Sequence, residues 1–217
     1  MGLPRFSRAE AAFILGVPIA WGLLLLLHPG GEASEIYANL QDSVARALIV
    51  HIGMMIFLPL FAIVIYLLLR GIESTAARVA RIALIPFVVL YVAWEAMQGI
   101  ANAVLTDKVN SLPSADQAIG ADLIQEFAES PLVRDAGALI IPATIALVVA
   151  TVALGIALRD AGAPRWAPVL FGLAGLLISA HPPPYGPIGL VLFVVGTVLI
   201  MRDKHLVNEP VPRPGPA

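Results

Sequence analysis

The sequence contains no cysteine, which excludes disulfide bonds, thiolate metal ligands and thiol redox chemistry. Charged residues are scarce as well: they make up 13% of 217 residues, whereas soluble domains carry about 25%. Only two of the 13 basic residues, Lys108 and Lys204, are lysines. The net charge of −2 offers no general attraction to nucleic acid. The sequence also lacks a Gly-rich phosphate loop and a Gly-x-Ser-x-Gly elbow, so common nucleotide and hydrolase motifs are absent.

What the chain has instead is apolar surface, since 59% of its residues are hydrophobic and its mean hydropathy is +0.89. A chain of this composition cannot cover its apolar side chains by folding in water. We therefore expect an integral membrane protein with one membrane domain, whose first partner is the lipid bilayer. The excess of arginine, alanine, glycine and proline points to a GC-rich bacterial genome and hence to the bacterial cytoplasmic (inner) membrane.

Six apolar segments are candidate membrane spans, and a span needs about 20 apolar residues. They cover Ala11–Leu27, Val44–Leu69, Val79–Leu105, Ala136–Leu158, Trp166–Ala180 and Pro187–Met201. The first four have adequate length, whereas the last two are short. The predicted fold class is all-α, a polytopic membrane protein with six transmembrane helices.

The basic residues near the span ends predict the orientation, because cytoplasmic loops are enriched in Lys and Arg. With six spans, ten basic residues fall on the side of both termini: Arg5, Arg8, Arg70, Arg78, Arg81, Arg159, Arg165, Arg202, Lys204 and Arg213. Three fall on the other side: Arg46, Lys108 and Arg134. Both termini are therefore predicted to be cytoplasmic.

Two segments outside the spans have a recognisable pattern. Residues 113–130 place Ile119, Leu123, Ile124 and Phe127 on one helical face, which predicts an amphipathic surface helix in the outer loop between the third and fourth spans. Its Ser114 and Gln117 have the spacing of a capping box. The Pro-rich residues 205–217 are predicted to be a disordered cytoplasmic tail after a membrane domain at 1–204.

The stretch HPPPYGP at residues 181–187 separates the last two spans. Only 36 residues from Trp166 to Met201 are present for two crossings and a turn, so we expect the turn to be recessed into the outer part of the membrane domain. Proline has no N–H, and four prolines remove donors that would be costly at that depth. They also hold His181 and Tyr185 rigidly, and the helix is predicted to end at His181.

Three of the four histidines are predicted to lie at this same level. His28 ends the first span in another His-Pro pair, and the first and fifth spans run in the same direction. His51 lies near the start of the second span, about one helical turn inside it, and Met55 follows on the same face. The fourth histidine, His205, belongs to the tail.

The third span supplies a polar stripe of Tyr91, Glu95, Gln98 and Asn102. Their spacings of 4, 3 and 4 place them within about 60° of one another around a helix. Glu95 is the one acid well inside a span, and a carboxylate there is expected to face the bundle interior, either paired or protonated. The candidate site is therefore a pocket of His28, His51, Glu95 and His181, with Tyr91, Gln98, Asn102, Tyr185 and Met55 around it.

Three kinds of function fit this pocket. Three imidazoles and a carboxylate suit zinc or copper, and two histidines on different helices could hold haem b. Copper or haem would allow redox chemistry. A small proton-coupled transporter is the alternative, with Glu95 and the histidines relaying protons. A non-catalytic subunit or assembly factor, in a homo-oligomer or a larger membrane complex, needs nothing beyond packing. The sequence does not decide whether the protein is an enzyme.

Overall fold

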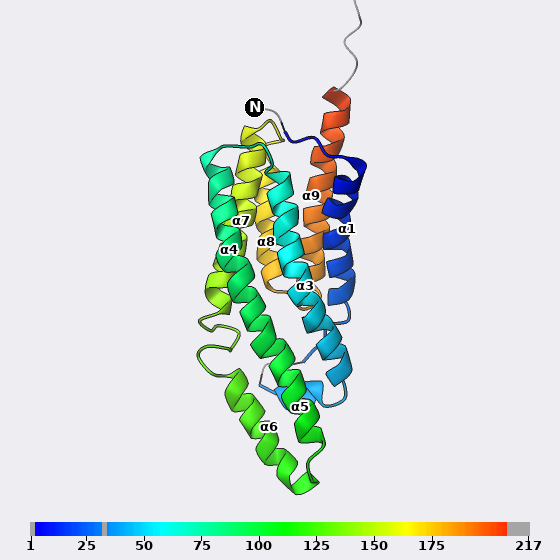
Figure 1. Cartoon of the computed structure of the whole chain (residues 1–217), viewed down its shortest axis with the longest axis vertical. Coiled ribbons are helices and arrows are strands. Elements are labelled where there is room, and N and C mark those ends of the chain that lie inside the picture. Colours follow the sequence, from blue (N-terminus) through cyan, green and yellow to red (C-terminus); the bar gives the residue numbers. More distant parts are fainter. Residues whose placement is uncertain (1–2, 32–33, 208–217) are drawn as a thin grey trace, which may run out of the picture.

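The structure, a computed structural model, describes residues 3–31 and 34–207. Every regular element in these residues is a helix (Figure 1). Within it, five helices are long and apolar enough to cross a membrane: α1 (Arg8–Leu25), α3 (Val44–Leu68), the continuous helix Thr75–Asn110, α7 (Ile140–Asp160) and α9 (Tyr185–Val207). The fifth predicted span forms α8 (Ala167–Ser179), an apolar helix of 13 residues. A helix of this length rises only about 20 Å, which is less than the thickness of a hydrocarbon core.

The third predicted span is the middle of a helix of 36 residues. It consists of α4 (Thr75–Trp94), the π-helical turn η1 (Glu95–Ala101) and α5 (Asn102–Asn110). Short π-helical insertions are frequent at functional sites, because the wider turn redirects side chains that a regular helix would hold elsewhere. This insertion begins at the buried carboxylate of Glu95.

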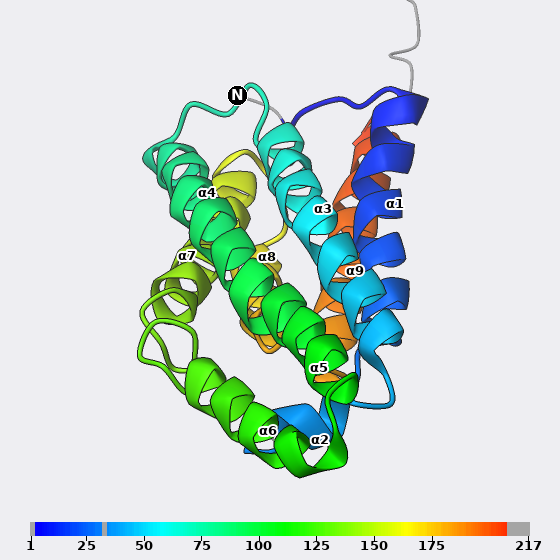
Figure 2. The same ribbon diagram turned by 60° about the horizontal axis from the view of Figure 1, so that its bottom comes forward.

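The end of the molecule opposite the N-terminus is formed by α5, α6 (Ser114–Ala128) and the short α2 (Ile36–Leu40), which contact one another (Figures 1 and 2). The amphipathic helix predicted at 113–130 is present as α6, but its predicted capping box is wrong. Pro113 is the N-cap and no side chain caps the helix, because Ser114 already lies inside it. Gln117 instead donates a hydrogen bond from Nε2 to the carbonyl of Leu112 at 3.0 Å.

The predicted apolar face of α6 divides into two parts. Ile124 is buried against the rest of this end of the molecule, whereas Ile119 and Leu123 are 63% and 61% exposed. The helix therefore buries the side that carries Gly120, Ile124 and Ala128.

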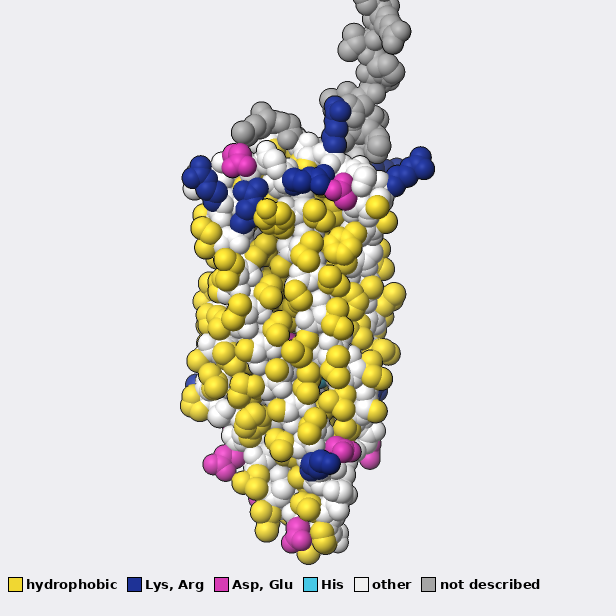
Figure 3. Space-filling model, in the orientation of Figure 1, with side chains coloured by type: hydrophobic (Ala, Val, Ile, Leu, Met, Phe, Trp, Pro, Cys, Tyr) yellow, Lys and Arg dark blue, Asp and Glu magenta, His cyan; other side chains and the backbone are white. Residues whose placement is uncertain are grey.

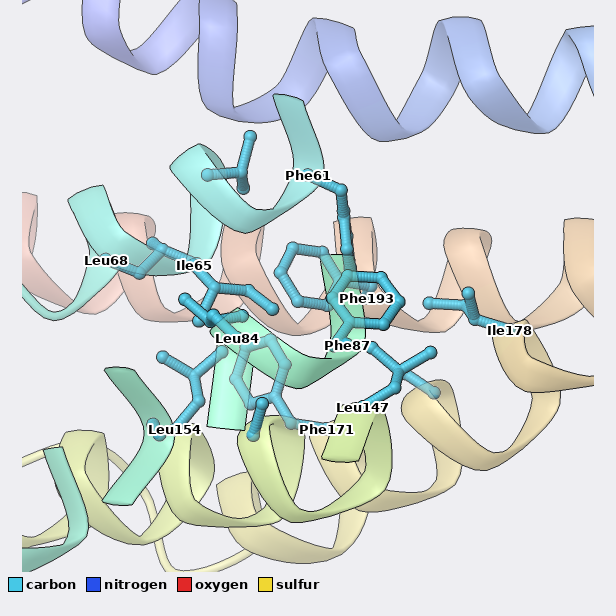
Figure 4. Close-up of a cluster of buried hydrophobic side chains, with 14 of the residues drawn as sticks. Phe61, Ile65, Leu68, Leu84, Phe87, Leu147, Leu154, Phe171, Ile178 and Phe193 are labelled. Carbon is cyan, nitrogen blue, oxygen red and sulfur yellow. The ribbon is translucent and has the colours of Figure 1, made fainter. Parts of the chain in front are cut away.

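The core is made by aromatic, branched aliphatic and alanine side chains from every long helix. Phe61, Phe87, Phe171 and Phe193 come from four different helices and meet in its centre (Figure 4). The ring of Phe193 lies 4.7 Å from that of Phe61 and 5.1 Å from that of Phe171. Such offset and edge contacts are the favourable arrangements of aromatic rings. On the outside, large apolar side chains cover the middle of the bundle, and charges gather toward its ends (Figure 3).

The turn between α8 and α9 is short. Helix α8 ends at Ser179, two residues before the predicted end, and α9 begins at Tyr185. His181 is buried at 6% exposure, whereas Tyr185 is 55% exposed. Gly186 makes this packing possible, because a Cβ there would lie 2.1 Å from the carbonyl oxygen of His181. Helix α9 continues to Val207, past the predicted domain boundary, and residues 208–217 of the predicted tail lie outside the described residues.

Candidate functional site

The structure brings His28, His51 and His181 together from three different parts of the chain. His28 follows the end of α1, His51 lies near the start of α3, and His181 lies in the turn between α8 and α9. The ring of His28 is central, with its centroid 5.1 Å from that of His51 and 4.9 Å from that of His181. The rings of His51 and His181 are 6.5 Å apart. The three imidazoles thus form one cluster, as the sequence pattern predicts.

The hydrogen-bond partners of His28 fix its tautomer, and those of His181 allow two arrangements. Nδ1 of His28 lies 2.7 Å from the carbonyl oxygen of Pro29, which can only accept, so this nitrogen carries the hydrogen. The hydroxyl of Tyr91 donates to the carbonyl of Ser179 at 3.2 Å and lies 3.3 Å from Nδ1 of His181. In that arrangement Nδ1 of His181 is the donor to the tyrosine oxygen. Both Nε2 atoms then carry lone pairs, and they face each other at 3.2 Å.

The third imidazole is held by a carboxylate. Nδ1 of His51 lies 2.6 Å from Oε2 of Glu95, whose side chain is fully buried. Donation from Nδ1 to the carboxylate leaves Nε2 of His51 free for another partner. The contact depends on Gly99, because a Cβ there would lie 2.2 Å from Cγ and Nδ1 of His51. Glu95 and Gly99 both belong to η1. The π-helical turn therefore provides both the carboxylate that bonds to His51 and the space in which its ring fits.

Other residues of the predicted pocket are distributed more widely. Asn102 is buried and donates from Nδ2 to the backbone carbonyl and the side-chain oxygen of Gln98, at 2.8 and 3.2 Å. Gln98 itself lines the cavity beside the histidines. Tyr185 and Met55 are not among the residues that line it, since Tyr185 is largely exposed and Met55 is half-buried.

A cavity of about 470 Å³ borders the cluster. Its polar lining comes from His28, Asn39, His51, Gln98, Asp135, Ser179 and His181. Asp135 and Trp94 were missed by the sequence reasoning. The indole of Trp94 lies 5.4 Å from the ring of His181 and donates from Nε1 to the carbonyl of Val133 at 2.6 Å. Nothing in the local pattern marks either residue, because Asp135 lies in an acidic loop and Trp94 in an apolar run.

Burial controls the charge of the groups around the cavity. It lowers the pKa of His28 to about 4, with a smaller contribution from the neighbouring His51. It also lowers the pKa of His181 well below its usual value and raises that of Asp135. Desolvation disfavours the charged form of each group, so His28 and His181 are neutral near pH 7.

The arrangement is not a finished metal centre. Within residues 3–31 and 34–207, no group of three or more His, Cys, Asp or Glu side chains is arranged to hold a metal ion. Two of the potential nitrogen ligands, Nε2 of His28 and Nε2 of His181, lie 3.2 Å apart.

In comparisons with protein-family models, curated proteins and solved structures, nothing matches this chain. The class of protein therefore follows from the fold and the composition. Long apolar helices with exposed apolar side chains around the middle of the bundle define a multi-pass helical membrane protein that contacts the lipid bilayer.

Proposed function

We propose that the protein binds a zinc or copper ion through His28, His51 and His181, with Glu95 balancing the charge of the ion through His51. The observation that carries this proposal is the 3.2 Å between Nε2 of His28 and Nε2 of His181, both of which carry lone pairs when each Nδ1 is the donor. Two lone pairs at that distance repel unless a cation lies between them. Because burial keeps both imidazoles neutral, a metal ion suits this position better than a proton.

The distances agree with two ligands of one tetrahedral ion. With zinc–nitrogen bonds of about 2.0–2.1 Å, two ligand nitrogens stand roughly 3.3 Å apart and their ring centroids roughly 5.2 Å apart. The nitrogen distance of 3.2 Å and the centroid distances of 4.9 and 5.1 Å are close to these values. The 6.5 Å between His51 and His181 is too long. A shift of roughly 1 Å in one of these two rings completes a three-histidine site.

Each imidazole has its second nitrogen bonded to a protein group, which is the usual condition of metal-binding histidines. The partners are Glu95 for His51, the carbonyl of Pro29 for His28 and the hydroxyl of Tyr91 for His181. Haem is disfavoured, because axial ligands on opposite faces of an iron stand about 4 Å apart with the porphyrin between them. The pair of His28 and His181 is closer than that.

The proposal includes six spans in a bacterial cytoplasmic membrane, with both termini on the cytoplasmic side. It is supported by the ten-to-three distribution of basic residues and by the apolar character of α8. The histidine cluster then lies in the outer half of the membrane domain and its cavity belongs to the outer face.

Metal analysis of the purified protein tests the proposal. After dialysis against one equivalent of zinc or copper, the wild type should retain about one ion per chain. Single changes of His28, His51 or His181 to Ala should each lose most of the ion, because the side chains that bind one ion act together. His205→Ala is the matched control, and it should keep the ion. Wild-type protein that retains neither zinc nor copper contradicts the proposal.

A second candidate function is proton transfer, and one observation favours it. If the hydroxyl of Tyr91 donates to Nδ1 of His181, then Nε2 of His181 carries a hydrogen and donates it to Nε2 of His28. Tyr91, His181 and His28 then form a continuous hydrogen-bonded row. Tyr91→Phe separates the two functions: it should interrupt proton transfer, whereas a metal site that retains all three imidazoles should lose affinity only about 10- to 100-fold.

A further inference from the structure

Three buried oxygen atoms along a single helix have no hydrogen-bond partner in the described protein: Oε1 of Glu95, Oδ1 of Asn102 and Oγ1 of Thr106. All three side chains are fully buried. Among the described residues, the only other such atom is Nε1 of Trp21, in a different helix. Buried polar groups without a partner are rare and costly, so three along one helix require an explanation.

Two other buried threonines show what Thr106 lacks. Thr151 donates to the carbonyl of Leu147 at 3.0 Å, and Thr197 donates to that of Phe193 at 2.8 Å. Both satisfy their hydroxyls within their own helix in the usual way for apolar surroundings. Thr106 has the equivalent carbonyl one turn back but does not bond to it. Its hydroxyl is therefore available to a partner outside its own helix.

The row of polar residues that contains Asn102 and Thr106 leads to an exposed end of the molecule. Asn102, Thr106 and Asn110 follow one another at intervals of four residues, and each interval rises about 6 Å. Two hydrogen bonds of about 2.8 Å, joined by one water molecule, span nearly that distance. Asn110 is exposed and accepts from the hydroxyl of Tyr37 at 2.9 Å. It lies where α2, α5 and α6 meet, at the end shown in Figure 2.

The row begins at the second oxygen of Glu95. Oε2 is bonded to Nδ1 of His51, which borders the cavity. Oε1 has no partner, and Glu95 is not among the residues that line the cavity. The carboxylate therefore has one oxygen for the histidine cluster and one that remains available to a different path.

We propose that Asn102 and Thr106 line a file of internal water molecules that carries protons between Glu95 and the exposed end at Asn110. The proton shared by Nδ1 of His51 and Oε2 of Glu95 moves onto the carboxyl group, and a rotation of that group turns the proton toward the first water. Each water passes one of its own protons onward. The hydroxyl of Thr106 accepts one proton and donates another, and the amide oxygen of Asn102 anchors a water by accepting from it. One proton reaches bulk water, another returns along the same file to His51, and the carboxylate keeps the negative charge. This path does not depend on whether the histidines bind a metal ion.

The exchange rate of the proton shared by His51 and Glu95 with bulk water tests the proposal. It can be measured by nuclear magnetic resonance on full-length protein with ¹⁵N-labelled histidine in lipid nanodiscs. Thr106→Val keeps the shape and removes the hydroxyl, and Asn102→Leu removes the amide. Each should slow the exchange about tenfold, equivalent to about 1.4 kcal/mol in the barrier. Thr106→Ser should restore a rate close to that of the wild type.

Thr197→Val is the matched control, because it removes an equally buried hydroxyl that is satisfied within its helix, and it should leave the rate unchanged. Wild-type exchange rates in folded Thr106→Val and Asn102→Leu proteins would overturn the proposal. An experimental structure gives an independent answer. Water within hydrogen-bonding distance of Thr106 and Asn102 supports the path, whereas a Thr106 hydroxyl bonded to the carbonyl of Asn102 in a dry interior overturns it.

Discussion

Gly99→Ala is the most informative single change, because it acts on the histidine cluster without removing any polar group. The new Cβ would lie 2.2 Å from Cγ and Nδ1 of His51 and 2.8 Å from its Cβ. Ordinary contacts of this kind begin at 3.4 Å, so the ring or the helix must move by about 1 Å. The hydrogen bond of 2.6 Å between His51 and Glu95 cannot survive that displacement with its present geometry.

The size of the effect follows from the burial of Glu95. Breaking a buried pair and leaving a charge uncompensated costs about 3–5 kcal/mol. Alanine is a better helix former than glycine by about 0.8–1.0 kcal/mol, which offsets part of that loss. We therefore expect Gly99→Ala to lower the free energy of unfolding by about 2–4 kcal/mol. Reversible denaturation in detergent micelles measures it.

Gly16→Ala is the control for this prediction. It is also a glycine within a long apolar helix, but a Cβ there meets nothing within 4 Å. This variant should be neutral or up to about 1 kcal/mol more stable than the wild type. If Gly99→Ala proves as stable as Gly16→Ala and retains the hydrogen bond between His51 and Glu95, the close packing of η1 on α3 is wrong.

Three further predictions concern charge, topology and pH. Glu95→Gln should lower metal affinity about 10- to 100-fold while the protein still folds, because it acts through His51, and unchanged metal content would show that Glu95 only joins helices. A reporter fused after Ala217 should be active only in the cytoplasm and one inserted at Ser114 only outside, and both on one side would exclude six spans. Since burial lowers the pKa of His28 to about 4, the unfolded chain binds its proton first. The free energy of unfolding should therefore fall as the pH decreases from about 6.5 toward 4, and a flat pH profile would argue against this burial.

The positions of the long helices could be read from the sequence because each is encoded locally. A run of about 20 apolar residues is by itself enough to predict a span. The predicted segment 44–69 coincides with α3, and the predicted segment 79–105 lies within the helix Thr75–Asn110. The stripe from Tyr91 to Asn102 is equally local, since helical periodicity alone brings its members to one side. The short length of α8 was visible as a short apolar run, and its membrane depth is still a prediction.

Only the tertiary structure decided how the histidines meet. Helix direction gives the histidines a common depth. The packing of α1 on α3 and α9 determined which rings touch at that depth. Packing also turned Tyr185 outward, brought Asp135 and Trp94 to the cavity, and opened a π-helical turn where Gly99 receives His51. These features depend on contacts between residues far apart in the chain. No local periodicity carries that information, because side-chain direction at a turn or a bulge is set by whatever packs against it.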